Sequence, residues 1–235
     1  LATAEAASGN IDAAGKRLDD LLKAQPDHGP ALLLQARLTA GRGDTVAALA
    51  QVEALLAKQA DNADAWQFKG DLLMRAKAGE KPATDKAIAA YEEAVKRRPD
   101  ALGAHSALVT LAMAANDPAL AAKRWEPMKK VAPRHPQTMF LDAVLSEQRG
   151  DLKHAREVSQ ELLRVTPGNP QLLVLAGQVE ARLNALAQAE TYFGKAVQLM
   201  PKAVQPRLQL AQLQLKGGQA DKALGTLAPL LDDAN

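Results

Sequence analysis

A 34-residue recurrence constrains the fold of this chain more than any other feature of its sequence. One alanine returns seven times, and every step is 34 residues except one of 39 residues: Ala14, Ala48, Ala87, Ala121, Ala155, Ala189 and Ala223. A proline stands twelve residues after five of these alanines, at Pro26, Pro99, Pro133, Pro167 and Pro201. A fixed period of this length is typical of stacked supersecondary units rather than of one globular core.

The composition indicates that these units are helical. Hydrophobic residues make up 47% of the chain and aromatic residues only 3%, with much alanine and leucine among them. Both residue types favour helices, and the Asn-Gly and Asp-Gly pairs that typify tight hairpins are missing. We therefore expect an all-α chain in which each unit is a pair of antiparallel helices, A and B.

Turn residues predict where these helices begin and end. A glycine or asparagine holds the equivalent place after each helix A, at Gly9, Gly43, Asn116, Gly150, Asn184 and Gly218. These residue types tolerate the left-handed conformation that closes a helix. Asp44, Asp117 and Asp151 follow directly and can cap the next helix B. The recurring alanine then falls one turn into helix B, where we expect the two helices to approach closely.

The unit resembles the tetratricopeptide repeat. The segment 63–101 shows the pattern of that family best, with Trp66, Gly70, Leu73, Ala87, Tyr91, Ala94 and Pro99. The resemblance implies a right-handed superhelical α-solenoid. We expect a single domain over residues 1–235, divided into a partial repeat at 1–28 and repeats at 29–62, 63–101, 102–135, 136–169, 170–203 and 204–235.

Two irregularities interrupt the period. The step of 39 residues places five extra residues in the turn between the helices of repeat 63–101, and we expect residues 76–85 to form a polar turn. This turn is either simply solvated or a protrusion beside a binding surface. Pro127 and Pro229 fall inside two B helices, and we expect both helices to bend or to end early.

Several classes of function lack the residues that they need. The net charge is +2, the chain has no cysteine, and the four histidines show no spacing typical of metal ligands. We expect neither a catalytic site nor a cofactor or metal, and we expect no nucleic-acid partner. No apolar run reaches the length of a membrane span. Basic clusters such as Lys96–Arg98 are interpreted as a solvated outer face, with attachment to an acidic partner or an anionic membrane as the alternative.

The resemblance to tetratricopeptide proteins implies a concave groove lined by set positions of the A helices. Carried onto this sequence, these positions are Leu33, Arg37, Gln67, Asp71, Met74, Ser106, Thr110, Met113, Phe140, Val144, Glu147, Val174, Gln178, Leu208 and Gln212. Gln137, Gln171 and Gln205 precede them at 34-residue steps and would form a row of amides with Gln178 and Gln212. Amides both donate and accept hydrogen bonds, so this row suits peptide backbones or sugar hydroxyls, although a surface-filling role is equally compatible.

A narrower resemblance concerns the C-terminal part of the chain. Leu175-Ala176-Gly177, Gln188-Ala189-Glu190 and the closing segment 227–231 are similar to the tetratricopeptide lipoproteins that accompany exosortase/PEP-CTERM protein sorting and exopolysaccharide export. This implies a non-enzymatic scaffold that binds an extended peptide or partner protein in its groove, in the periplasm or at the outer membrane. The alternatives are a polysaccharide-binding module and a cytoplasmic location. Neither end carries the polar cap that a solenoid needs, so we also expect weak end-to-end self-association and further repeats beyond the chain.

Overall fold

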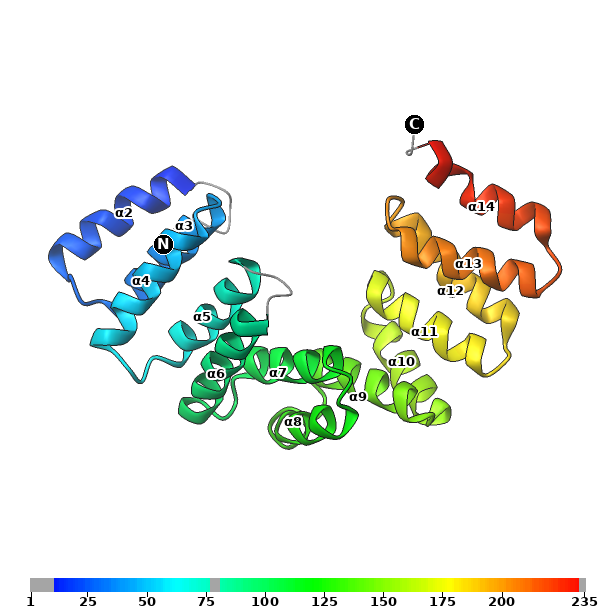
Figure 1. The fold of residues 1–235 in the computed structure, drawn as a ribbon, viewed down its shortest axis with the longest axis horizontal. Helices are drawn as coiled ribbons and strands as arrows, with labels where there is room; N and C mark the ends of the chain where they lie inside the picture. Colours follow the sequence, from blue (N-terminus) through cyan, green and yellow to red (C-terminus); the bar gives the residue numbers. More distant parts are fainter. Residues whose placement is uncertain (1–10, 77–80, 233–235) are drawn as a thin grey trace. The chain divides into compact units, whose positions relative to one another are not determined.

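The computed structural model of the chain describes residues 11–76 and 81–232, and its regular structure there is entirely helical (Figure 1). The helices are α2 (Ile11–Ala24), α3 (Gly29–Gly41), α4 (Thr45–Lys58), α5 (Ala63–Ala76), α6 (Lys81–Arg97), α7 (Leu102–Ala114), α8 (Pro118–Val131), α9 (Pro136–Arg149), α10 (Leu152–Val165), α11 (Pro170–Arg182), α12 (Leu186–Leu199), α13 (Val204–Lys216) and α14 (Ala220–Asp232). Each predicted repeat from residue 29 onward contains one helix pair. The all-α class is therefore confirmed.

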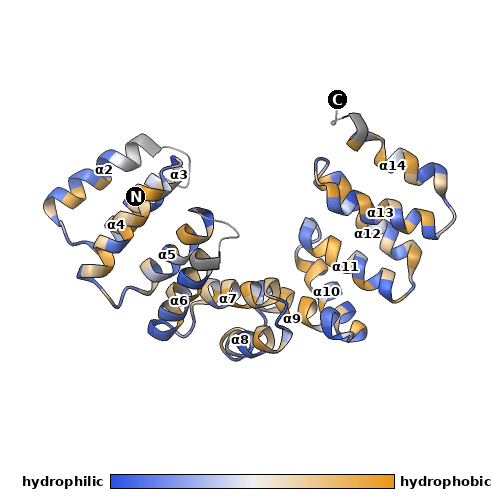
Figure 2. Cartoon of the chain, viewed as in Figure 1, coloured by the Kyte–Doolittle hydropathy of each residue, from blue (hydrophilic) through white to orange (hydrophobic). Residues whose placement is uncertain are grey.

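The helices group into two compact units, Leu1–Val131 and Ala132–Asn235. In each unit a helix contacts the next one along the chain, so that A and B helices alternate in a stack. Hydrophobic and hydrophilic residues are mixed along the described helices (Figure 2), as expected for helices that bury one side against their neighbours. The grouping of all repeats into one domain stays a prediction.

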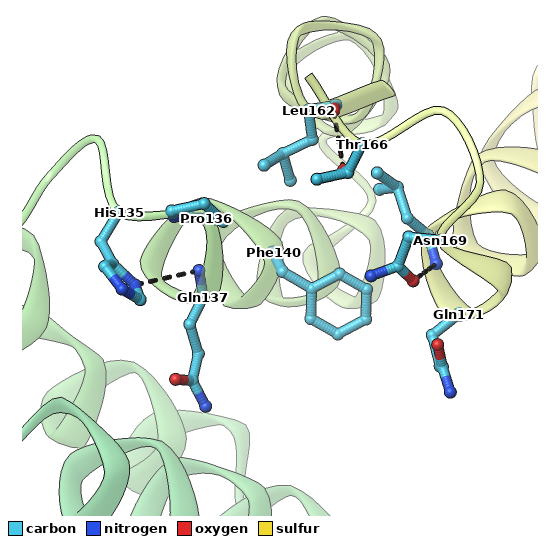
Figure 3. Close-up of a pocket in the computed structure, with 9 residues that line it drawn as sticks. His135, Pro136, Gln137, Phe140, Leu162, Thr166, Asn169 and Gln171 are labelled. Atoms are coloured by element: carbon cyan, nitrogen blue, oxygen red, sulfur yellow. Dashed lines mark hydrogen bonds between the residues drawn. The ribbon is translucent and has the colours of Figure 1, made fainter. Parts of the chain in front are cut away.

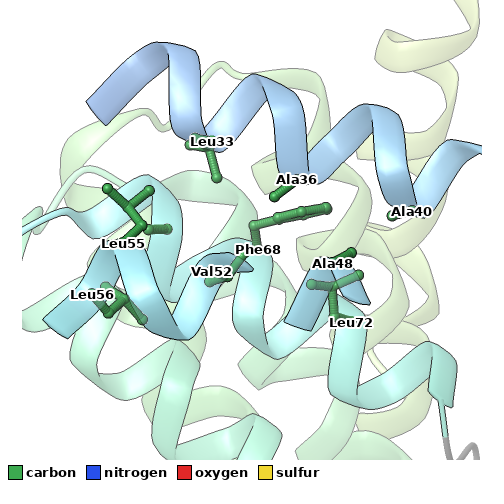
Figure 4. Close-up of a cluster of buried hydrophobic side chains, with 10 residues drawn as sticks. Leu33, Ala36, Ala40, Ala48, Val52, Leu55, Leu56, Phe68 and Leu72 are labelled. Carbon is green, nitrogen blue, oxygen red and sulfur yellow. The ribbon is translucent and has the colours of Figure 1, made fainter. Parts of the chain in front are cut away.

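The recurring alanine lies where helices A and B meet. Five of its occurrences, from Ala48 to Ala189, have no exposed surface, and Ala223 is 1% exposed. The side chain of Ala14 lies outside the description. Figure 4 shows Ala48 beside Val52 and near Ala36 of the preceding helix in one such cluster of buried residues. A larger side chain at this place would clash, which explains why the period is carried by alanine.

Two glycines let an aromatic ring lie directly on helix A. A methyl group added at Gly70 would stand 2.6 Å from the Tyr91 ring, and one at Gly177 would stand 2.7 Å from the Phe193 ring. Both rings are buried, at 3% exposure. These contacts explain the small residue in helix A and the aromatic residue in helix B that the repeat pattern pairs.

The predicted helix ends are confirmed at the described positions. Gly43, Gly150 and Gly218 have positive φ angles, as do Asn116 at 56° and Asn184 at 61°. The carboxylates of Asp44, Asp117 and Asp151 each accept a hydrogen bond from a backbone N–H three residues later, at 2.9, 2.9 and 3.3 Å. Gly9 lies outside the described residues.

A hydrogen bond joins successive repeats at the position that holds tryptophan in the family pattern. The indole of Trp66 donates to the carbonyl of Ala60 at 2.8 Å. At the same repeat position, His105 Nε2 lies 2.9 Å from the carbonyl of Pro99, and Arg207 donates to that of Pro201 at 2.8 Å. The acceptor is always six residues earlier, in the turn that ends the preceding repeat.

One expectation about an irregular segment is wrong, and so is the early end that was one of two outcomes expected at the internal prolines. Residues 81–85 belong to α6 rather than to a turn, because a proline such as Pro82 is tolerated in the first turn of a helix. The protrusion would lie at 77–80, outside the described residues. Helices α8 and α14 continue past Pro127 and Pro229, so neither ends early. Each proline leaves one carbonyl four residues earlier without its helical partner, at exposed Lys123 and Gly225, where water can hydrate it.

Candidate functional site

One face of the A helices in the second unit carries two hollows lined by residues that the sequence predicts for the groove. The hollows involve mainly α9, α11 and α13, together with Leu162 of α10 and Phe193 of α12. We call them the Phe140 hollow and the Lys216 hollow. Because both lie within the unit Ala132–Asn235, their geometry is independent of the first unit.

The Phe140 hollow has an apolar floor and a polar rim. Its volume is about 370 Å³. It is lined by His135, Pro136, Gln137, Phe140, Leu162, Thr166, Asn169, Gln171 and Leu172. Figure 3 shows the Phe140 ring between Gln137 on one side and Gln171 on the other. The structure therefore brings together three residues predicted for the groove, with an aromatic ring between two amides.

The rim of the Phe140 hollow is held in place by helix caps. His135 Nδ1 accepts a hydrogen bond from the backbone N–H of Gln137 at 3.2 Å, and Asn169 Oδ1 accepts one from that of Leu172 at 3.0 Å. The Thr166 hydroxyl donates to the Leu162 carbonyl at 2.9 Å. These bonds fix the starts of α9 and α11, on which Gln137 and Gln171 stand.

The Lys216 hollow is more polar. Its volume is about 450 Å³. It is lined by Glu147, Gln178, Ala181, Arg182, Phe193, Gln209, Gln212, Leu213 and Lys216. Three of these, Glu147, Gln178 and Gln212, are predicted groove residues. Arg182 and Lys216 are not among the predicted groove residues because they lie in the last turns of α11 and α13, four residues past Gln178 and Gln212, the last positions taken from the family on these helices.

Of the three charged residues that line the Lys216 hollow, two pair with each other. Arg182 donates to Glu147 Oε1 at 2.6 Å, so these two residues neutralise each other. Lys216 forms no ion pair with any residue that the structure describes. The oxygen of the Gln209 amide is buried there without a hydrogen-bond donor among the described residues. The hollow thus combines one unpaired cation with amides that have hydrogen-bonding capacity left.

The two hollows are two helical turns apart on the same face. Phe140 and Glu147 on α9 are seven residues apart, as are Gln171 and Gln178 on α11. Seven residues make almost two full turns, so each pair points to the same side of its helix. Val144 and Val174 lie between these positions and are half-buried. Gln205 is exposed at the start of α13 and does not line either hollow.

The groove positions of the first unit do not gather in this way. The exposed Arg37 lies over the ring of Phe68, with 5.5 Å between guanidinium and ring centre, and lines a smaller hollow with Leu33. Gln67 packs against Gly103, and Met74 is half-buried in a core cluster. Leu33 and Ser106 are 7% and 8% exposed. Both side chains point mainly into the packed interior and add little surface to a groove, although Leu33 still lines that smaller hollow.

Asp71, another predicted groove residue, is engaged within the fold. It accepts a hydrogen bond from the Tyr91 hydroxyl at 2.8 Å. Burial raises the pKa of Asp71 above its usual value and outweighs that bond and the nearby Arg37 and Arg75, which lower it. Burial and the facing carboxylate also raise the pKa of Tyr91 far above its usual range. The pair holds α5 against α6 rather than facing a ligand.

The basic cluster at residues 96–98 is largely paired inside the first unit. Arg98 binds both carboxylate oxygens of Asp64, at 2.6 and 2.9 Å, and lowers the pKa of that carboxyl. Arg97 binds Glu93 and lies 5.0 Å from the centre of the Trp66 ring. These contacts favour the interpretation of the cluster as an outer face that stabilises the fold.

The described residues show little that resembles catalytic chemistry. No group of three or more His, Cys, Asp or Glu side chains within them could hold a metal ion. His154 Nε2 lies 3.0 Å from Asp142, and the buried Ser146 hydroxyl donates to the same carboxylate at 3.4 Å. Asp142 therefore stands between the other two, whereas a serine nucleophile needs histidine in that place.

Family models match most of the sequence. Two models, both described as tetratricopeptide repeat, match residues 1–51 and 106–170 in one case and residues 182–235 in the other. Together they cover more than half of the chain and agree with the helix pairs and buried alanines above. The chain belongs to the tetratricopeptide-repeat family. No curated protein sequence matches it.

Solved structures agree with this assignment of the tetratricopeptide-repeat fold. A tetratricopeptide repeat protein from Parabacteroides merdae ATCC 43184 has a TM-score of 0.70 and 14% identity, covering 97% of this chain and 88% of that one. The APC/C hetero-tetramer Cut9-Hcn1 gives a TM-score of 0.78 at 15% identity, covering 97% of this chain and 45% of the other. The human IFIT1 dimer with m7Gppp-AAAA gives 0.68 at 18% identity, covering 98% of this chain and 58% of the other.

These likenesses show the fold of this tetratricopeptide-repeat chain. Such proteins are generally non-catalytic scaffolds for protein interactions. Among the structures above, one contains a protein partner and another contains m7Gppp-AAAA, so the fold by itself does not select the partner. Within the part of the chain that the structure describes, no helix is both long and apolar enough to cross a membrane.

Proposed function

We propose that this chain is a non-enzymatic scaffold that binds an extended peptide, or an extended segment of a partner protein, on the A-helix face of its second unit. One observation carries the proposal: the Phe140 hollow and the Lys216 hollow lie on the same face of α9 and α11 and are lined by amides. Side-chain amides can donate to peptide carbonyls and accept from peptide N–H groups. An extended chain presents both groups at regular intervals.

We propose further that this scaffold works in the bacterial envelope, in protein sorting or exopolysaccharide export. This role is supported by the resemblance of the C-terminal repeats to the lipoproteins of those systems. We also propose a location in the periplasm or at the outer membrane. The complete reading frame and its chromosomal neighbours test this part, and a frame without an export signal or anchor would contradict it.

A triple substitution tests the binding face. Changing Gln137, Gln171 and Gln178 to glutamate removes amide donors and adds negative charge, while the three side chains keep their size. We expect a partner captured by the wild-type chain to be lost, by pull-down with quantitative mass spectrometry. Circular dichroism must show that the helices are intact.

A matched control carries the same three changes on the B helices. Gln160, Gln188 and Gln198 are exposed on α10 and α12, so their replacement by glutamate alters net charge equally without touching either hollow. This control should retain the partner. Loss of the partner from both variants alike would contradict the proposed face.

A glycan is the second candidate ligand, and the Phe140 hollow is the observation that favours it. A single aromatic ring flanked by amides can stack on a sugar and bind its hydroxyl groups. Titration calorimetry with an exopolysaccharide measures this directly. Absence of heat with the wild-type chain, at concentrations that saturate a weak site, would eliminate the candidate.

A further inference from the structure

We propose that the second unit selects a peptide with an apolar residue and, at least three positions away, an acidic residue. The apolar side chain enters the Phe140 hollow and the acidic side chain enters the Lys216 hollow. This inference rests on the proposed function and adds the chemistry and spacing that the partner must have.

The Phe140 hollow suits one large apolar side chain. Phe140, Leu162 and Leu172 form its apolar lining. Its volume of about 370 Å³ leaves room for a leucine or an aromatic ring. The surrounding amides and His135 stand at the rim, where they reach a peptide backbone rather than the inserted side chain. Burial of an apolar group on Phe140 would provide most of the binding free energy at this end.

The Lys216 hollow suits a carboxylate. Its one carboxylate, Glu147, is already bound by Arg182, so Lys216 leaves an uncompensated positive charge at an exposed rim. Gln178, Gln209 and Gln212 can donate further hydrogen bonds to the same anion. A lysine or arginine of the partner would instead meet Lys216 and Arg182 with like charge. Charge complementarity therefore selects an acidic residue at this end.

The spacing follows from helix geometry. Gln171 and Gln178 are seven residues apart on α11, which corresponds to about 10 Å along the helix axis. An extended peptide advances by about 3.3 Å per residue, so at least three residues cover this axial distance. The sideways step from α11 to Lys216 on α13 adds to that minimum. Val144 and Val174 lie along the path and present a half-buried apolar strip to the peptide between the two side chains.

A displayed library of random peptides, each long enough to cross both hollows, tests the inference on the whole chain. We expect selection to enrich an apolar residue followed or preceded, at one fixed spacing of three or more positions, by aspartate or glutamate. Replacing that acidic residue by its amide should weaken binding about fivefold, and added salt should weaken the parent peptide more than the amide form.

A charge reversal at Lys216 gives the decisive comparison. Lys216→Glu should weaken the selected peptide by about tenfold and should shift a new selection toward lysine or arginine at the same position. Lys195→Glu is the matched control, because Lys195 is exposed on α12, outside both hollows. This control should retain both affinity and preference.

The outcomes separate the inference from the proposed function. Selected peptides that lose binding in the triple glutamine variant but show no acidic preference would overturn the inference and leave the proposed binding face intact. Selected peptides that bind that variant as well as the wild type would overturn both. Failure to enrich any peptide would overturn both as well and would favour the glycan.

Discussion

At the scale of single residues, one repeat position keeps a chemical role while its side chain changes completely. Trp66, His105 and Arg207 all reach the carbonyl six residues earlier through a nitrogen. Because the place requires only one hydrogen bond to that carbonyl, any long side chain with a nitrogen donor can fill it. Leucine or methionine occupies the position in the other repeats. Their departure from the family pattern is therefore larger than that of histidine or arginine.

The residue-scale prediction concerns Asp71. Its folded-state pKa is raised by burial, so the charged form is less favourable in the folded chain than in the unfolded chain. Asp71→Asn removes that charge and keeps an oxygen that can accept from Tyr91. We expect the variant to have a higher free energy of unfolding at neutral pH, measured in urea.

The size of this effect should depend on pH. As pH falls through the raised pKa, the wild-type carboxyl takes up a proton in the folded state and loses its disadvantage. The difference between the two proteins should therefore shrink toward acid. A variant that is less stable than the wild type at neutral pH would show that the charge, through Arg37 and Arg75, is worth more than its burial costs.

Some residues of the candidate site could be predicted from the sequence, and others could not. Gln137, Phe140 and Gln171, which the sequence proposes for the groove, line one hollow because the 34-residue period places such residues on the same side of neighbouring A helices. Lys216 could not be found this way, since its role depends on how Glu147 and Arg182 pair in three dimensions. Burial of Leu33 and Ser106 likewise depends on local packing rather than on repeat position.

At the scale of elements, helix α8 tolerates an internal proline. The ring of Pro127 removes the hydrogen bond to Lys123, yet the helix runs on to Val131. Trp125 and Met128, on either side of the proline, are 4% and 0% exposed, so packing against the rest of the unit holds the helix together. The sequence predicts that this helix bends or ends early. The early end does not occur, because these contacts hold the residues after the proline in the helix.

Restoring the hydrogen bond should stabilise this element. We expect Pro127→Ala to increase the free energy of unfolding by about 1–3 kcal/mol, since alanine is the better residue inside a helix. Urea denaturation followed by circular dichroism measures the change. Some of the gain is offset because alanine gives the unfolded chain more freedom. Equal or lower stability would mean that the helix is bent to suit the proline.

At the scale of the whole molecule, the chain is a series of contacts between neighbours. Each helix packs mainly on the ones before and after it, and the helices form two compact units. The all-α class and the helix pairs followed from the sequence because a strict period repeats the same packing requirement. Grouping into two units could not be predicted, since the spacing of the alanines is the same across residue 131.

This organisation predicts that a destabilising substitution weakens only the helices close to it. Ala155 has no exposed surface between α9 and α10, and Ala155→Leu should overpack that contact and cost about 1–3 kcal/mol. Hydrogen exchange should show faster opening of α9, α10 and α11, whereas protection of α3 to α6 should be unchanged.

Either of two results would contradict the prediction that Ala155→Leu destabilises only the neighbouring helices. Unchanged stability would mean that the alanine does not stand in a tight contact. Faster exchange throughout the chain, including α3 and α4, would mean that the two units open together.

The bond from Trp66, His105 and Arg207 to the carbonyl six residues earlier crosses the junction between one sequence repeat and the next. A cut at that junction separates donor from acceptor, although it looks like the natural border in the sequence. Arrays shortened or lengthened by protein engineering are therefore better joined inside the turn between helices A and B. There the segment that is moved carries both partners of the bond with it.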